Sequence, residues 1–284
     1  PAPLLFFMCM TTPLSSGPRL DEQNLRYIMT HLSHDELEQA ARTNYAYMNQ
    51  QQDKEERISG AMRMAQRYLN SKKDPDVALR NLKETLEFRN SINMEALLNA
   101  RYPDSEHHTK LYKILNTKQL YVSGYDTAGR STYIFVPRKV ESHGEWTLQA
   151  HIWTLEKAIA CSKHDNGTVN AVIDFTGFSY SQAPPLSLGR EIMTTLRQHY
   201  VGSIHKIFLV NAPSAFYCLW NMLKPFAGRA TRDKIQFVNS TSRELAELCS
   251  PAEAASWMVP NGQKNKPLDV DEYLQLPFDV AFDE

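Results

Sequence analysis

The string that most suggests chemistry is Asp174-Phe175-Thr176-Gly177, which closes an apolar run over 169–175. An acid at the carboxyl end of a buried strand lies where α/β folds place their ligands. A phosphotransferase that forms an aspartyl-phosphate needs such an acid and normally a second one two residues later. Thr176 occupies that second place. Asp174 is therefore predicted to be a structural acid that caps the following turn, with the phosphotransferase as a remote alternative.

Other catalytic and metal-binding patterns are missing from the sequence. It contains no GxGxxG, GxxxxGK[ST] or HExxH, and residues 177–181 (GFSYS) lack the last glycine of a nucleophile elbow. The nine histidines are scattered, and Cys9, Cys161, Cys218 and Cys249 form no CxxC pair. We expect no metal site, no cofactor and no enzymatic activity, and we expect reduced thiols, as is usual in a cytoplasmic protein.

The overall charge is balanced, with 31 Lys and Arg against 32 Asp and Glu. Such a balance gives no basic footprint for nucleic acid, so any attraction to an anionic surface must be local. No apolar run reaches the roughly 18–20 residues that a membrane span requires.

The first part of the chain carries helical signals. Ile58, Met62, Ala65 and Leu69 recur at helical spacing with charges between them. A further helix is expected after Asp74-Pro75, an N-cap followed by proline at the first helical position. Residues 1–104 are predicted to form a helical lobe.

Residues 105–284 alternate between strand and helix signals. Strands are predicted at 120–122, 132–136, 169–175, 206–210 and 235–238, and helices at 145–163, 186–199, 214–224 and 243–249. This order predicts an α/β lobe with a mixed, mostly parallel sheet and flanking helices.

An ordered series of motifs resembles the CRAL-TRIO family, the Sec-fourteen-type phosphatidylinositol-transfer proteins and their tocopherol- and retinal-binding relatives. The pieces are 67–73 (RYLNSKK), 82–89 (LKETLEFR), 126–133 (DTAGRSTY), 172–177 (VIDFTG), 206–213 (KIFLVNAP), 223–226 (LKPF) and 231–235 (TRDKI). They resemble the family's RFLRARKFD segment, its helix ending in W-R, D-x-x-GRPV-Y, hhDhxG, K-hhhhNAP, hKPFL and T-x-x-KI, in that order. The resemblance covers roughly 57–249.

The resemblance implies a helical lobe followed by an α/β lobe whose helices enclose a hydrophobic pocket. The apolar strands would supply the floor of this pocket, although such residues on their own are more often plain sheet core. The expected pocket residues are Tyr133, Phe135, Ile173, Phe175, Phe208 and Val210.

The segment after Asn211-Ala212-Pro213 is apolar nearly all round, so it is either a buried helix or one that meets another apolar phase. In the family the matching helix is a gate that moves at the bilayer. The expected gate and membrane-contact residues are Phe216, Trp220, Leu223 and Phe226.

The resemblance also implies a head-group site, in which this sequence departs from the family. Lys72 stands where phosphatidylinositol binders have an arginine, and Thr231 and Lys234 match the T-x-x-K pair. The family's glutamate before the K-hhhhNAP strand corresponds to Gly202. Val169 and Ala171 replace the Ser-x-Thr that grips the phosphate of phosphatidylcholine. Thr231 and Lys234 can equally be a cap and a surface charge.

These features together predict a cytoplasmic, peripheral membrane protein that carries a phospholipid, with phosphatidylinositol favoured and no nucleic-acid partner. The alternatives are a lipid-sensing interaction module and a carrier of another hydrophobic ligand, such as a tocopherol or a retinoid. The acidic tail over 269–284 might pack over the sheet edge or contact a protein partner.

Overall fold

The computed structural model describes residues 20–41, 54–164, 167–239, 245 and 268–282. The chain divides into two compact units, Pro1–Phe88 and Arg89–Glu284. Residues 89–104, which the sequence analysis assigns to the helical lobe, fall in the second unit. The reason is local: Arg89 forms a buried ion pair with Glu156, and the Trp153 indole donates a hydrogen bond to the Leu98 carbonyl oxygen.

The first unit is helical, with α2 (Leu20–Thr30), α3 (His34–Ala41), α4 (Lys54–Lys72) and most of α5 (Pro75–Ser91). A capping box starts α3, because the Ser33 hydroxyl accepts from the Glu36 amide and the Glu36 carboxylate accepts from the Ser33 amide. The Asp74 carboxylate accepts hydrogen bonds from the amides of Asp76 and Val77, which confirms it as the cap of α5.

The second unit is built on a five-stranded sheet in the order β1-β2-β3-β4-β5. The strands are β1 (Leu120–Tyr125), β2 (Ser131–Phe135), β3 (Val169–Asp174), β4 (Ile204–Val210) and β5 (Ile235–Val238). Only β1 runs antiparallel to its neighbour, and the pairs from β2 to β5 are parallel. The predicted mixed, mostly parallel α/β sheet is confirmed.

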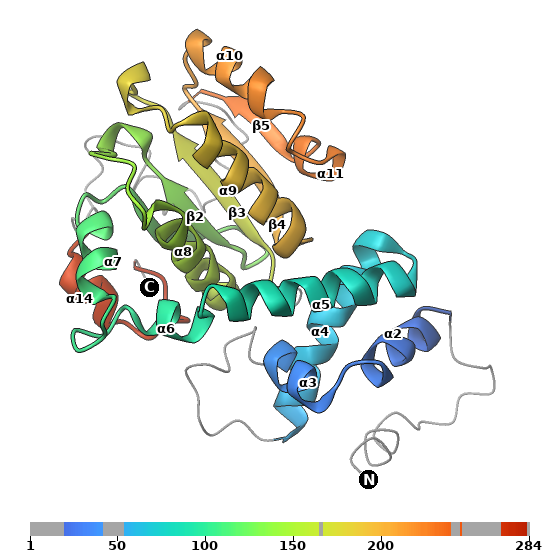
Figure 1. Cartoon of the computed structure of the whole chain (residues 1–284). Coiled ribbons are helices and arrows are strands. Elements are labelled where there is room, and N and C mark those ends of the chain that lie inside the picture. The colour runs from blue at the N-terminus through green and yellow to red at the C-terminus, as the bar shows by residue number, and fades with distance from the viewer. Residues whose placement is uncertain (1–19, 42–53, 165–166, 240–244, 246–267, 283–284) are drawn as a thin grey trace. The chain divides into compact units, whose positions relative to one another are not determined.

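Helices α8 (Thr147–Cys161) and α9 (Leu186–His199) cross the same face of this sheet (Figure 1). Short helices α6 (Met94–Asn99) and α7 (His108–Leu115) precede the sheet, and α10 (Ser214–Leu223) and α11 (Arg229–Arg232) lie between β4 and β5. Most side chains of α8 are buried, so this helix forms the centre of the unit. Of the helix predicted at 243–249, only Leu245 lies within the described residues.

Strand alternation divides the apolar residues between the two faces of the sheet. Val172, Phe208 and Val210 are fully buried on one face, where Leu245 and Val238 pack against them. The residues next to them in sequence point to the opposite face, toward α8 and α9, and supply the site described below.

The end of the chain packs along β1. Helix α14 (Val270–Gln275) begins at Asp269, whose carboxylate accepts from the Glu272 amide. The Val122 amide donates to the Tyr273 hydroxyl oxygen at 3.0 Å, and the Phe282 amide donates to the Val122 carbonyl oxygen at 3.1 Å. Of the two expectations for the acidic tail over 269–284, packing over the sheet edge describes its residues 269–282.

Candidate functional site

The second unit encloses a cavity of about 180 Å³ between α8, α9, α10 and the sheet. Its walls come from segments far apart in sequence, including the loop over 178–184. Because water needs polar partners, a cavity with predominantly apolar walls is suited to an apolar occupant.

The floor of the cavity is formed by the sheet. Strands β2, β3 and β4 contribute Tyr133, Phe135, Ala171, Ile173, Ile207 and Leu209, and Phe175 follows β3. Four of the expected pocket residues are thus among the lining residues, namely Tyr133, Phe135, Ile173 and Phe175. Phe208 and Val210 do not line it, because they occupy the alternate positions of β4 and point to the other face of the sheet.

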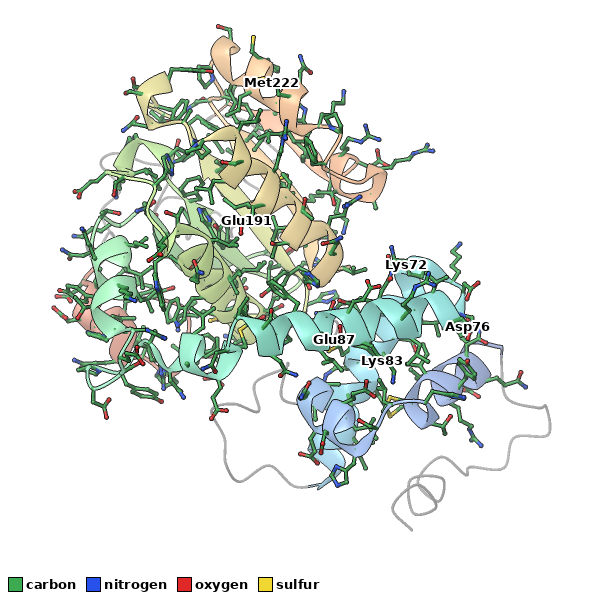
Figure 2. The ribbon with its side chains drawn as sticks, viewed as in Figure 1. Lys72, Asp76, Lys83, Glu87, Glu191 and Met222 are labelled. Carbon is green, nitrogen blue, oxygen red and sulfur yellow. The ribbon has the colours of Figure 1, made fainter. Side chains whose placement is uncertain are left out.

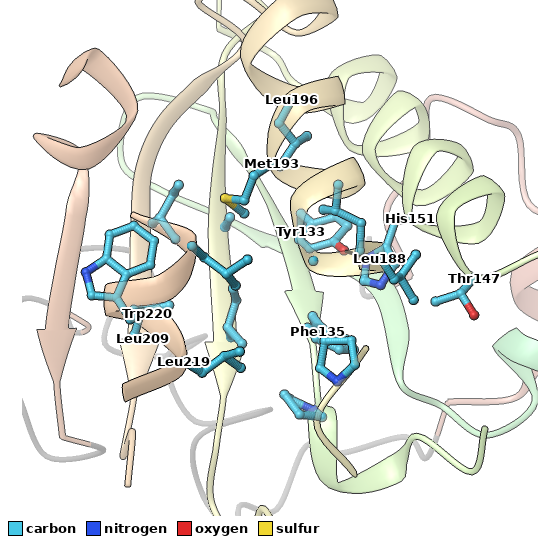
Figure 3. A pocket seen from close by; sticks show the side chains of 18 of the residues that line it. Tyr133, Phe135, Thr147, His151, Leu188, Met193, Leu196, Leu209, Leu219 and Trp220 are labelled. Atoms are coloured by element: carbon cyan, nitrogen blue, oxygen red, sulfur yellow. Dashed lines mark hydrogen bonds between the residues drawn. The ribbon is translucent and has the colours of Figure 1, made fainter. Parts of the chain in front are cut away.

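Helices α8 and α9 form one long wall (Figure 3). The lining residues of α9 recur at helical spacing: Leu188, Gly189, Ile192, Met193, Thr195 and Leu196. Helix α8 adds Thr147, Leu148, His151, Ile152 and Leu155. The sequence analysis did not single out these residues, although the apolar stripe of α9 was a usable signal.

Helix α10 closes the cavity with Phe216, Leu219, Trp220 and Leu223, one helical face at spacings of three and four residues. Its other side faces outward: Tyr217 is 44% exposed, and Met222, labelled in Figure 2, is 46% exposed. Phe226 lies outside the lining, with the Arg190 guanidinium 4.8 Å from its ring centre. The segment therefore presents apolar side chains both to the cavity and to solvent.

The contact between α9 and α10 is closest at Gly189. A Cβ atom built on this glycine would lie 3.1 Å from Leu223 Cδ2, which is tighter than ordinary van der Waals contact. A side chain at position 189 would therefore force the end of the Leu223 side chain to shift by a few tenths of an ångström.

No Asp, Glu, Lys or Arg side chain is among the described residues that line the cavity. The polar lining consists of Tyr133, His143, Thr147, His151, Gln182, Thr195 and Thr231. Tyr133 and His151 bond to each other, with 2.6 Å between the hydroxyl oxygen and Nδ1. Burial lowers the pKa of His151 to about 4 and raises that of Tyr133, so both side chains are neutral at pH 7.

The three expected head-group residues have different surroundings. Thr231 lines the cavity. Lys234 is not among the lining residues; its ammonium donates to the Ile204 carbonyl oxygen, and burial lowers its pKa. Lys72 is exposed at the end of α4, in the first unit.

Asp174 behaves as the predicted turn cap. Its carboxylate accepts a hydrogen bond of 2.9 Å from the Thr176 amide. Within the described part of the chain, no three His, Cys, Asp or Glu side chains gather as metal ligands would. Within the same residues, no helix is long and apolar enough to cross a membrane.

Residues 115–255 match the CRAL/TRIO domain. Over 107 residues the chain is 32% identical to the phosphatidylinositol/phosphatidylcholine transfer protein SFH11 of Arabidopsis thaliana, an alignment covering 37% of this chain and 28% of SFH11. Over 178 residues it is 23% identical to the phosphatidylinositol transfer protein PDR17 of Saccharomyces cerevisiae, covering 60% of this chain and 50% of PDR17. The chain spans half or less of the length of the curated relatives it matches.

The crystal structure of Sfh5 superposes with a TM-score of 0.59 at 16% identity, over 79% of this chain and 82% of Sfh5. This similarity shows a shared fold. Together with the match over 115–255, it shows that the chain contains a CRAL/TRIO domain and belongs to that family.

Proposed function

We propose that this chain carries one lipid molecule in the cavity beneath α9 and α10 and exchanges it with membranes by outward movement of α10. The observation that carries the proposal is the predominantly apolar cavity, which has no Asp, Glu, Lys or Arg among its described lining residues. Moving a lipid through water exposes its chain at about 0.8 kcal/mol per methylene. An apolar chamber of this kind removes that penalty.

The volume of the cavity supports a moving gate. At about 180 Å³ it is only somewhat larger than an engineered cavity of about 150 Å³ that binds benzene. It is smaller than the roughly 300–1,000 Å³ of typical ligand pockets. A full lipid therefore requires the walls to move apart, and α10 is suited to this because its exposed Tyr217 and Met222 can enter a bilayer surface.

The charge of the lining residues limits the classes of lipid that the cavity can bind. An ionised phosphate inside an apolar chamber needs a cation or several hydrogen-bond donors. Among the residues expected to supply them, only Thr231 lines the cavity, and the ammonium of Lys234 is bonded to a backbone carbonyl. We therefore rank an uncharged lipid first. Phosphatidylinositol is the second candidate, favoured by Thr231 and by the names of the relatives SFH11 and PDR17.

Native mass spectrometry of the full chain purified from cells tests lipid carriage directly. We expect a stoichiometric adduct whose mass and fragments identify the lipid. Ala171→Phe, which adds a ring to the cavity floor, should abolish the adduct. Protein that is folded but carries no lipid, and that takes none up from vesicles, would contradict the proposal.

A transfer assay between vesicles tests the gate. Trp220→Asp places a charge on the cavity face of α10, where it disfavours closure of the helix over an apolar ligand, so we expect transfer to fall at least tenfold. Asn221→Asp adds the same charge to the exposed side and is the matched control. Transfer at the normal rate in Trp220→Asp would exclude α10 as the gate.

Binding without transfer in the unmodified chain would instead favour a lipid-sensing module, whose exposed tail acids Asp271 and Glu272 are the candidate protein contact.

A further inference from the structure

Two exposed aromatic rings lie against each other where α10 meets the edge of the sheet. Tyr217, on α10, and Phe237, on β5, stack with 4.7 Å between the ring centres and 17° between the ring planes. Tyr217 is 44% exposed and Phe237 is 38% exposed. Figure 1 shows α10 beside β5, which is the outermost strand on this side of the sheet. We call Tyr217 and Phe237 the outer stack.

The residue before Tyr217 makes a contrasting contact inside the protein. The ring centre of Phe216 lies 4.3 Å from that of Phe175, which is only 6% exposed. Both of these rings line the cavity. Successive side chains of a helix point about 100° apart, so α10 places one ring inward and the next one on the edge strand.

The position of Phe237 is fixed by the sheet. Ile235 lines the cavity, and Phe237, two residues later, lies on the same face of β5. The parallel pairing of β5 with β4 runs from Ile235 to Val238. The Asn211 amide, three residues before α10, donates to the Val238 carbonyl oxygen at 2.9 Å. The chain therefore stays attached to β5 at Asn211, and α10 beyond it is the part that can leave Phe237.

The inner contact and the outer stack differ in what replaces them when α10 moves outward. Phe216 and Phe175 face the cavity, so the hydrocarbon chain of a lipid can cover them. The outer stack faces solvent, so its separation in water uncovers both ring faces, which is unfavourable. At a bilayer surface the same rings contact lipid, and tyrosine in particular is favoured at that interface. The cost of separating the outer stack therefore depends on whether a bilayer is present.

We propose that the outer stack is a latch that holds α10 closed in water and separates at a bilayer surface, where both rings contact lipid instead of each other. This inference rests on the proposed function of α10 as the gate and specifies what regulates its opening. Tyr217 and Phe237 do not line the cavity, so they act as positioning residues for α10 and not as ligand contacts.

Hydrogen exchange of the full chain as purified from cells tests the latch. The exchange rate of the backbone amides of 214–223 reports how often α10 leaves its contacts. In buffer, we expect Phe237→Ala to speed this exchange about two- to tenfold, the effect of losing one aromatic pair. When phosphatidylcholine vesicles are added, the bilayer replaces the stack, so the variant and the unmodified chain should exchange within about twofold of each other.

Two further variants assign the effect to the stacking of the rings. Phe237→Tyr keeps a ring on β5 and should retain the slow exchange of the unmodified chain. Tyr102→Ala removes a ring that is 41% exposed in the segment before α7, and as the matched control it should leave the exchange of 214–223 unchanged. Thermal unfolding shows whether each variant is folded, and native mass spectrometry of the same samples shows whether it carries lipid.

The outcomes separate the latch from the function on which it rests. Unchanged exchange of 214–223 in Phe237→Ala in buffer would overturn the latch, and so would an increase that is equally large with and without vesicles. Both results leave lipid carriage and the α10 gate intact. If the unmodified chain carries lipid but its exchange over 214–223 does not rise when vesicles are added, the gate and the latch are both wrong. A folded chain that neither carries lipid nor takes it up would overturn the proposed function and the latch with it.

Discussion

Two buried polar sites in the second unit differ in how many of their hydrogen-bond donors and acceptors have partners. At Lys157 on α8, the ammonium has three N–H groups and contacts three carbonyl oxygens, those of Pro277 at 3.1 Å, Phe278 at 3.3 Å and Val280 at 2.9 Å. Lys157 is 1% exposed, and its ammonium lies 5.1 Å from the centre of the Tyr273 ring. Every donor has a partner from the protein itself.

The polar side chains of Tyr133, His143 and His151, which line the cavity, are the opposite case. Tyr133 and His151 satisfy each other only in part, and Nδ1 of His143 has no partner among the described residues. A buried polar group whose hydrogen bonds are all made stabilises the fold, whereas one with bonds left over costs free energy that the rest of the structure must offset.

The strongest test of this comparison replaces Lys157 by methionine. Methionine has a similar length and no donor, so three buried carbonyl oxygens lose their partner. We expect the free energy of unfolding to fall by about 4 kcal/mol. Denaturant unfolding measures the loss, and limited proteolysis should show earlier cleavage within 268–282. Lys113→Met, at an exposed lysine of α7, is the control and should change stability by less than about 0.5 kcal/mol. A similarly small loss of stability in Lys157→Met would show that the hydrogen bonds of Lys157 do not stabilise the fold as the comparison requires.

Acidification tests the buried Tyr133–His151 pair. The pKa of His151 is about 4 in the folded chain, below the ordinary value of 6.5 that applies when unfolded. Between these two pKa values His151 binds a proton in the unfolded state but not in the folded state. The free energy of unfolding therefore falls as the pH drops from about 6.5 to about 4. The loss from this one residue is about 3 kcal/mol.

Thermal unfolding of a His151→Phe variant across that pH range measures the contribution. The variant should lose less stability on acidification than the unmodified chain, while His34→Gln, at an exposed histidine, should behave like the unmodified chain. His199, whose pKa is also lowered to about 4 by burial, keeps part of the acid sensitivity in both variants. An identical acid response in His151→Phe would show that His151 titrates normally.

Replacing Lys234 is expected to give the smallest loss of stability. It refines the comparison because Lys234, like Lys157, is a lysine whose ammonium donates to a backbone carbonyl. Its ammonium donates to one backbone carbonyl, that of Ile204, at a partly buried position. Lys234→Met should lower the free energy of unfolding by about 1 kcal/mol. A selective loss of phosphatidylinositol uptake from vesicles would instead restore Lys234 as a head-group residue.

Sequence patterns predicted the framework of the second unit well. The strand at 235–238 and the helix at 186–199 have their predicted bounds, because apolar periodicity and flanking turn residues are local properties of the chain. Asp74 and Asp174 were identified as caps for the same reason, since each bonds to backbone amides two or three residues away.

The site was less accessible to sequence reasoning. Phe208 and Val210 were assigned to the pocket because β4 is apolar on both faces, and alternation alone does not tell which face meets a cavity. The polar lining residues Tyr133, His143 and His151 come from β2, α8 and the segment before α8, and only the tertiary structure brings them to one cavity. Histidines scattered through the sequence therefore gave no indication of it. The sequence did not indicate the structural role of Lys157 because its partners are backbone carbonyls more than a hundred residues away.

The two hydrogen bonds at Val122 have a consequence for the behaviour of a shortened chain. β1 is an outermost strand, and both main-chain groups of Val122 are bonded to the C-terminal segment, one to the Tyr273 side chain and one to the Phe282 backbone. Removal of residues 268–282 would leave this amide and carbonyl without partners, beside the newly uncovered Trp153 ring. Such a bare strand is a template for pairing with another molecule, so the shortened protein should self-associate into aggregates before it loses its helices.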